Sequence, residues 1–263
     1  MKGSIVEQEA QRARWHRYRE GLQLDNPLST TFAHAGLGQR VEMPSLRLLI
    51  LHSDLDGVFL DFNQEFWNWW RSERIDPLAE CTDQWLQHTM PTAAAAIRFL
   101  KASDDKWMHY MALGRNGSFE MELGEGAAFE RSNRRNFNLT YSIGRVWYAF
   151  SVFSDVCKHL QLAGPVEITI GLIRTENSQI TGFGDGWAEP GSGFAMPTTN
   201  PGPNAMFRLE LETWPTNEAI QALAFRFGDW MEDVWGSQYR RYLSRQGPRA
   251  GRLDPRKYQY VWY

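Results

Sequence analysis

The stretch WMHYMALGRNGSFEMELG, residues 107–124, constrains the fold of this chain more than any other feature. It consists of two runs in which apolar and polar residues alternate, joined by Asn116 and Gly117. Asn-Gly between two such runs is the strongest short-range signal of a β-hairpin, because these residues tolerate the positive φ angles of a tight turn. Strands joined by a tight turn pair antiparallel. The sequence therefore predicts an antiparallel sheet here.

Other segments predict elements that extend this sheet or cover it. Apolar runs of strand length predict strands at 45–53, 165–173 and 206–214. Glu176-Asn177-Ser178 predicts a turn that brings a further strand beside the second of these, as a hairpin-like pair. Helices are predicted at 5–22, 62–75, 92–102, 143–165 and 218–243, the last with Thr216 as its N-cap. The predicted class is α+β, an antiparallel sheet built from hairpins with long amphipathic helices packed on it.

The predicted organisation is a single α+β domain over residues 1–263. Within it we expect a basic helical arm at 1–25, a Gly/Pro-rich loop at 184–204 and a basic and aromatic tail at 247–263. No internal repeat is visible. The loop at 184–204 is the best candidate for a boundary if the chain contains two domains.

Composition limits the functional classes. The formal net charge of −3 predicts no strong overall attraction to nucleic acid or to anionic membranes. Two cysteines, Cys81 and Cys157, are too few for a disulfide framework, which fits a reducing compartment. No apolar run has the length of a membrane span, and the first residues are charged where a signal peptide is apolar. The sequence therefore predicts a soluble cytoplasmic protein that does not engage the membrane.

The stretch LLILHSDLDGVFLD, residues 48–61, carries the strongest signal for catalysis. Two carboxylates one residue apart after an apolar strand, Asp54 and Asp56, can both reach one metal ion. The stretch resembles the first motif of the haloacid dehalogenase superfamily. That resemblance implies a phosphatase in which Asp54 is the nucleophile, Asp56 the acid/base and Mg²⁺ the cofactor, with Asp185 as a further metal ligand. Thr140, Lys158 and Glu189 would take the remaining family roles.

The surrounding pattern departs from that family. Lys158 lies within a predicted helix, and the predicted hairpins cannot supply the parallel sheet that the family fold requires. A polar turn whose aspartates bond to local backbone is the alternative, and His52 beside them could ligate a metal. In the hairpin, Glu120 and Glu122 share one face, which we expect to be solvated, with a paired acid/base site as the other interpretation. No P-loop, dinucleotide fingerprint or zinc spacing is present.

Basic residues gather at the two ends of the chain. Arg12, Arg14, Arg17 and Arg19 mark the first helix. The candidate nucleic-acid-binding residues near the C-terminus are Arg240, Arg241, Arg245, Arg249, Arg252 and Lys257, followed by the aromatic sequence YQYVWY. Arginine interleaved with aromatic residues suits nucleic-acid backbone and base stacking. A solvated helix end followed by a docked strand gives the same pattern. The 12 tryptophans suit either a core of large rings or an interaction surface.

The order of elements also resembles the C-terminal accessory region of bacterial Schlafen-type AlbA proteins, over roughly residues 6–240. The resemblance rests on a basic helix, a strand, a hairpin with Asn-Gly-Ser, a long aromatic helix ending in AGP, the strand VEITIGLI and a last long helix. It implies an accessory or sensor domain, and it carries no catalytic residues over to this chain.

These observations predict a non-catalytic binding domain, without a cofactor, that engages a protein or nucleic-acid partner through aromatic and arginine-rich surfaces. The alternative is a magnesium-dependent phosphatase that uses Asp54 and Asp56. A third interpretation is a ligand-binding domain in which the 184–204 loop covers an aromatic pocket.

Overall fold

A computed structural model provides the structure of the chain. The structure describes residues 5–21, 39–40, 45–53, 55, 60–71, 88–91, 95–103, 106–124, 128–131, 134–173, 175, 178–181, 205–235, 243 and 251–253.

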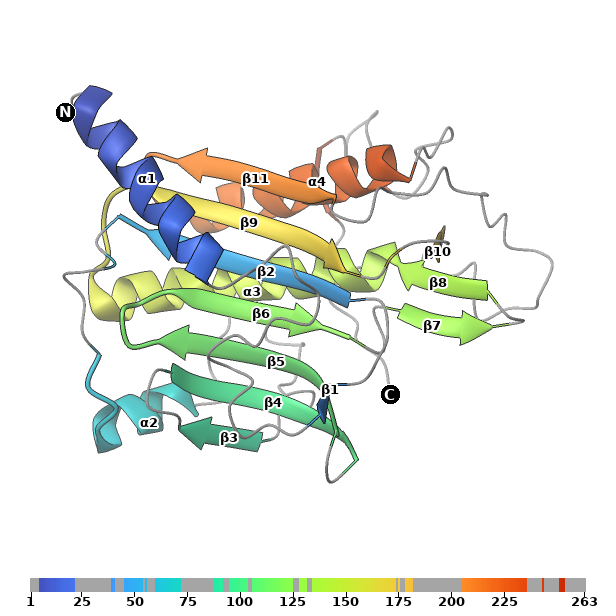
Figure 1. Cartoon of the computed structure of the whole chain (residues 1–263), viewed down its shortest axis with the longest axis horizontal. Coiled ribbons are helices and arrows are strands. Elements are labelled where there is room, and N and C mark those ends of the chain that lie inside the picture. The colour runs from blue at the N-terminus through green and yellow to red at the C-terminus, as the bar shows by residue number, and fades with distance from the viewer. Residues whose placement is uncertain are drawn as a thin grey trace.

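A large, mainly antiparallel sheet forms the centre of the molecule (Figure 1). Its strand order is β11-β9-β2-β6-β5-β4-β3, and every neighbouring pair along this path is antiparallel. The short strand β1 pairs parallel with β5. The strands span Gln39–Arg40 (β1), Ser45–His52 (β2), His88–Pro91 (β3), Ala95–Ser103 (β4), Lys106–Gly114 (β5), Phe119–Leu123 (β6), Val166–Ile173 (β9) and Met206–Leu211 (β11). The predicted α+β class is confirmed.

The predicted hairpin is formed by β5 and β6. The Gly117 N–H donates to the Gly114 carbonyl at 2.9 Å, and Gly117 has a φ of 76°, which a residue without a Cβ adopts at little cost. The Asn116 side chain accepts from the Ser118 N–H at 3.2 Å and from its hydroxyl at 2.7 Å. These local bonds explain why the turn could be predicted from the sequence alone.

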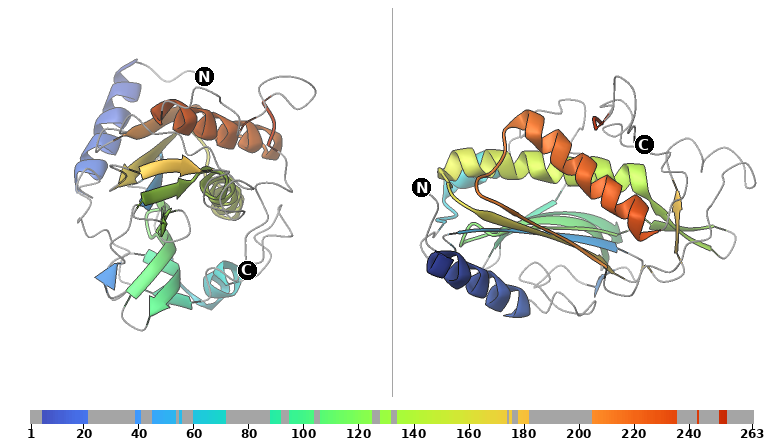
Figure 2. Two further views of the ribbon diagram at one scale, coloured as in Figure 1. Left: turned by 90° about the vertical axis from the view of Figure 1, so that its right-hand side faces the viewer. Right: turned by 90° about the horizontal axis from the view of Figure 1, so that it is seen from above.

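The helices of the described residues lie on the two faces of the sheet: α1 (Ile5–Gly21), α2 (Gln64–Trp70), α3 (Leu139–Leu160) and α4 (Asn217–Val234). Figure 2 shows α3 and α4 together over one face and α1 over the other. The main core lies between the sheet and α3, whose residues are mostly buried. A second, small apolar cluster joins α1 to the opposite face through Trp15, Leu49, Leu51 and Leu55.

The crossing of α3 and α4 depends on Gly228. A Cβ at this position would lie 2.5 Å from Cδ1 of Ile143 and 3.2 Å from Cδ1 of Leu243. The glycine weakens the helix locally, but its missing side chain lets α4 approach α3 closely. Its place in the sequence is therefore explained by packing.

A second, three-stranded sheet has the order β10-β8-β7, formed by Ala128–Arg131 (β7), Arg134–Asn138 (β8) and Ser178–Thr181 (β10). The hairpin-like pairing predicted for the segment QITGFG after the 176–178 turn is wrong, because β10 leaves the main sheet and pairs parallel with β8. The indole N–H of Trp235 donates to the Ser178 carbonyl at 3.3 Å, which ties the end of α4 to this sheet.

Two helix predictions also need correction. The alanine-rich segment 92–102 was predicted as a helix, but Ala95–Ser103 is strand β4, paired with β3 and β5. Alanine favours helices in isolation, and here pairing on both edges overrides that preference. The helix predicted to continue to Leu243 ends at Val234.

Asn138 caps the start of α3 by accepting from the Tyr141 N–H at 3.0 Å, and the left-handed Gln161 ends it before Gly164.

Within the described residues, no helix combines the length and apolar character needed to cross a membrane.

Candidate functional site

Most of the side chains predicted to act in a site lie outside the described residues. This holds for Asp54, Asp56 and Asp185, proposed for the phosphatase, and for Glu189. It also holds for Arg240, Arg241, Arg245, Arg249 and Lys257 of the predicted nucleic-acid surface. Arg252 is described, and it is exposed.

The residues around Asp54 and Asp56 are partly described and are held by the fold. His52 is 1% exposed, and its Nε2 lies 2.7 Å from the Asn116 carbonyl in the hairpin turn. Since a carbonyl only accepts, Nε2 donates there and is not available to a metal. Leu55 lies in the apolar cluster with Trp15. In the described part of the chain, no group of three His, Cys, Asp or Glu side chains could hold a metal ion.

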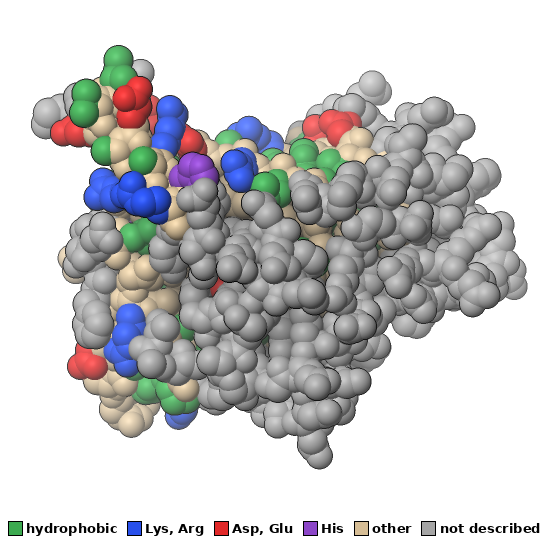
Figure 3. Space-filling view, viewed as in Figure 1, with side chains coloured by type: hydrophobic (Ala, Val, Ile, Leu, Met, Phe, Trp, Pro, Cys, Tyr) green, Lys and Arg blue, Asp and Glu red, His purple; other side chains and the backbone are tan. Residues whose placement is uncertain are grey.

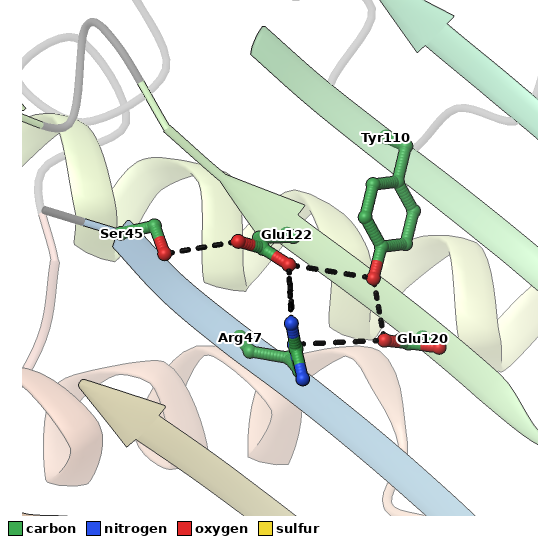
Figure 4. Close-up of polar contacts among 5 residues, drawn as sticks. All are labelled: Ser45, Arg47, Tyr110, Glu120 and Glu122. Atoms are coloured by element: carbon green, nitrogen blue, oxygen red, sulfur yellow. Dashed lines mark hydrogen bonds and ion pairs between the residues drawn. The ribbon is translucent and has the colours of Figure 1, made fainter. Parts of the chain in front are cut away.

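The structure brings together a buried charged cluster that the sequence interpretation missed (Figure 4). Arg47 on β2 places Nη2 2.9 Å and Nε 3.1 Å from Oε2 of Glu122 on β6. Its Nε lies 3.7 Å from Oε1 of Glu120. The Tyr110 hydroxyl on β5 donates to Glu120 Oε1, and the Ser45 hydroxyl donates to Glu122 Oε1 at 3.0 Å. Three neighbouring strands thus contribute to one network.

Strand register explains why these side chains meet. Arg47 is directly opposite Glu122, and Glu122 is directly opposite Tyr110 on its other side. Residues opposite each other in adjacent strands point to the same face, so the three form a row across the sheet. Glu120 lies two residues along β6 and faces the same way. The sequence signal was the Glu-x-Glu alternation in the hairpin, but its partner Arg47 is 75 residues away in the chain.

The expectation that Glu120 and Glu122 are solvated is wrong. Both carboxylates are 0% exposed, Tyr110 is 0% exposed and Arg47 is 2% exposed. Removal of ionised side chains from water is costly unless they are paired and hydrogen-bonded, and here the guanidinium and two hydroxyls supply the partners.

The cluster shifts the ionisation of its members. Burial alone lowers the pKa of Arg47, but the negative charges of Glu122 and Glu120 outweigh it and raise the pKa above the ordinary value for arginine. For Tyr110, burial raises the pKa well above 10.0, and the charges of Glu120 and Glu122 raise it further. The arginine is therefore charged and the phenol protonated at every physiological pH.

A carboxylate pair with a tyrosine and an arginine has the residue types of an acid/base site. A catalytic group must also come within hydrogen-bond reach of a substrate. With all four side chains at 2% exposure or less, the cluster is closed to substrate in this structure. We therefore assign it a structural role, joining β2, β5 and β6.

The raised pKa of Tyr110 predicts a decline of stability in alkali. An unfolded tyrosine loses its proton near pH 10, whereas the folded side chain keeps it, so above about pH 10 the folded state binds more protons. The contribution of Tyr110 to the free energy of unfolding is complete below pH 10. As the pH rises further, this contribution falls by at most about 1.4 kcal/mol per pH unit. Urea unfolding between about pH 9 and pH 11 should show a shallower decline for Tyr110→Phe than for the wild type. Parallel curves would contradict this assignment.

An open groove of about 730 Å³ lies where α3 ends and α4 begins. We call it the α3–α4 groove; its lining includes Cys157, Lys158, Leu162, Trp214, Pro215 and Glu218. Trp214 forms its aromatic wall, held edge-on against the ring of Phe153 at 4.7 Å. Cys157 is buried, and burial raises the pKa of its thiol to about 12. The thiol is therefore protonated and unreactive near neutral pH, and it serves as an apolar wall.

An aromatic ring of α2 also contacts the last turn of α3. Trp69 stacks on His159 of α3, with ring centroids 4.1 Å apart and planes 5° apart. The guanidinium carbon of Arg71 lies 5.2 Å from the centre of the Trp67 ring. We call Trp67, Trp69, Arg71 and His159 the aromatic surface. His159 follows Lys158 in the chain, so the groove and the aromatic surface both include a residue from the last turn of α3.

Comparisons with known proteins do not identify the chain. No protein-family model matches it, and neither a curated protein nor a solved structure matches it.

Proposed function

We propose that this chain is a non-catalytic interaction domain that binds a peptide segment of a protein partner in the α3–α4 groove. The observation that carries the proposal is the groove itself, an open depression of about 730 Å³ with an aromatic wall. Ligand-binding pockets in proteins have volumes of roughly 300–1,000 Å³, with mostly apolar walls and a few polar groups.

The lining suits a peptide. Trp214, Leu162 and Pro215 supply apolar walls, while Lys158 and Glu218 supply one charge of each sign at the rim. The side chain of Lys158 is 65% exposed and pairs with Asp155 at 3.0 Å. The aromatic surface, which shares the last turn of α3 with the groove, adds tryptophan and arginine, the residue types that dominate binding energy in protein interfaces.

A protein partner fits this site better than nucleic acid. Nucleic-acid grooves are lined mainly by cations that neutralise phosphates. In the α3–α4 groove the lysine is offset by Glu218 and by its pair with Asp155. An accessory or sensor role, as implied by the resemblance to Schlafen-type AlbA proteins, is part of this proposal.

The phosphatase alternative receives less support. Strand β2, which leads to Asp54, pairs antiparallel with both of its neighbours, β6 and β9. The resemblance to the haloacid dehalogenase superfamily implies a parallel sheet around that strand. We therefore expect no magnesium-dependent hydrolysis of a generic phosphomonoester; turnover that Asp54→Asn abolishes would establish the phosphatase instead.

Peptide selection tests the proposed binding function. A displayed peptide library would be selected on the immobilised full chain, and dissociation constants would be measured by fluorescence polarisation. Ala163 is exposed and lines the groove, so Ala163→Trp should fill it. We expect the dissociation constant of selected peptides to rise by about tenfold or more, equivalent to about 1.4 kcal/mol of lost contact.

The matched control is Ala13→Trp, the same change at an exposed alanine of α1. It should leave peptide affinity unchanged. If the selected peptides bind Ala163→Trp as tightly as the wild type, the groove is not their binding site. The chain could instead bind a single-stranded oligonucleotide, and Ala163→Trp but not Ala13→Trp could abolish that binding. This result would confirm the groove as the binding site and would identify nucleic acid, not a protein, as the partner.

A further inference from the structure

Strand β11 ends one side of the main sheet. Among the described strands it pairs only with β9, and no described strand lies along its other edge. An open edge exposes backbone donors and acceptors that can pair with another chain. Arg208 and Glu210 on this strand are exposed. They lie in the segment MFRLEL, where charged and apolar residues alternate.

The register shows which backbone groups face the open edge. Met206 is opposite Gly171 in the pairing of β11 with β9, so Ala205 is opposite Leu172. The Leu172 N–H donates to the Ala205 carbonyl at 3.1 Å. Hydrogen-bonded pairs alternate along an antiparallel ladder, so Phe207, Leu209 and Leu211 direct their backbone groups to β9. The N–H and C=O of Arg208 and Glu210 therefore point outwards.

We propose that two copies of this chain associate through antiparallel pairing of β11 with β11, about a two-fold axis at Leu209. In this register Arg208 of each copy lies opposite Glu210 of the other. Because both residues direct their backbone groups outwards, each such pair exchanges two backbone hydrogen bonds. Opposite charges facing each other across strands are favourable. The arrangement is isologous, as most homodimer interfaces are.

Neighbouring registers are less favourable. A two-fold axis at Arg208 would place the Arg208 side chains of the two copies opposite each other, and an axis at Glu210 would place the two Glu210 side chains opposite each other. Like charges directly opposite each other across strands are destabilising. A shift by a single residue pairs outward-facing backbone groups with inward-facing ones and forms no ladder. The order Arg-Leu-Glu therefore selects the register centred on Leu209.

Both faces of the sheet fit a continuation into a second copy. On the face covered by α3 and α4, Phe207 of one copy would lie opposite Leu211 of the other, and the two half-buried Leu209 side chains would meet. On the other face, Arg12 of α1 reaches Glu210 at 2.9 Å. A carboxylate accepts several hydrogen bonds, so it can bind Arg12 and the second copy's arginine together.

Helix α1 provides an independent observation. Its first turns extend past β11, beyond the edge of the sheet (Figure 1). Ile5 and Val6 in these turns are each 73% exposed, and they are the large hydrophobic side chains left exposed among the described residues. Basic, acidic and histidine side chains lie along α1 and the adjoining sheet edge (Figure 3). A second copy at this edge would provide an apolar surface against which Ile5 and Val6 could pack.

Charge complementation tests the proposal directly on the full chain. Sedimentation velocity over a concentration series should show a wild-type dimer. Arg208→Glu puts glutamates opposite each other in both pairs, and Glu210→Arg puts arginines there. Each variant alone should raise the dimer dissociation constant by about tenfold or more. An equimolar mixture of the two variants restores opposite charges in both pairs, so heterodimers should form with an affinity near that of the wild type.

The control is Glu212→Arg, the same charge reversal at an exposed residue that would face Met206 of the second copy. It should leave dimerisation intact. The proposal is overturned by a wild type that stays monomeric up to its solubility limit, by single variants that dimerise normally, or by a mixture that remains monomeric. These outcomes do not depend on the peptide-binding function, because no peptide is present in the experiment.

Discussion

Replacing Arg47 with methionine is expected to lower the free energy of unfolding by about 3–5 kcal/mol, because one side of a buried ion pair is removed. Methionine is similar in length and fills the same space, but it leaves Glu120 and Glu122 in a site that is 0% exposed without their cation. Urea unfolding followed by circular dichroism measures the loss. A change below about 1 kcal/mol would show that the cluster is more hydrated than its burial indicates.

Two further variants separate charge from packing. Arg12→Met makes the same substitution at an ion pair whose side chains are 59% and 43% exposed, and solvent screening should make its effect on stability much smaller than that of Arg47→Met. Glu120→Gln and Glu122→Gln combined with Arg47→Met remove the uncompensated charge while keeping the shape. This triple variant should recover part of the stability, because breaking a buried pair costs more than neutralising all of its members.

Replacing Trp15 with alanine is the second change with a large expected effect, and it acts on α1 alone. Trp15 is 2% exposed, contacts Leu49, Leu51 and Leu55, and donates from its indole N–H to the His52 carbonyl at 3.0 Å. Most of the remaining helix is exposed. Truncation of a buried tryptophan costs about 3–5 kcal/mol, and we expect that loss to appear as local opening of α1.

Hydrogen exchange measures that opening. Amides of α1 should exchange about a hundredfold faster or more in Trp15→Ala, while those of α3 should change much less. Trp15→Phe keeps apolar contact but loses the indole hydrogen bond, so it should give an intermediate rate. Gln8→Ala, at an exposed position of the same helix, is the control and should leave the rates unchanged. Equal acceleration in α1 and α3 would mean that α1 unfolds only with the whole domain.

Local elements could be predicted because their determinants are close in the sequence. The β5–β6 turn depends on Asn116, Gly117 and their immediate neighbours. Strand β2 depends on a continuous apolar run of strand length, and helix α3 on apolar residues at helical spacing. The polar helix at the N-terminus was also predicted. The sequence could not show that Trp15 docks this helix on the sheet, because a tryptophan on a free helical arm would give the same sequence pattern.

The candidate sites were less predictable. Glu120 and Glu122 have the spacing of a solvated strand face, and the cation that compensates their buried charge, Arg47, is far away in the chain. The α3–α4 groove needs the end of one helix and the start of another, which are separated by β9, β10 and β11. Asp54 and Asp56 attracted attention as a motif, although the strand before them lies in antiparallel pairing.

The sequence by itself determined the α+β class, the central hairpin and the apolar faces of α3 and the strands, since these follow from turn chemistry and periodicity. Only the tertiary structure decided that Ala95–Ser103 is a strand, that β10 joins a second sheet and that two glutamates are buried. The physical reason is that strand pairing and burial depend on residues from distant parts of the chain. Their free energy can exceed local preferences of about 1 kcal/mol per residue.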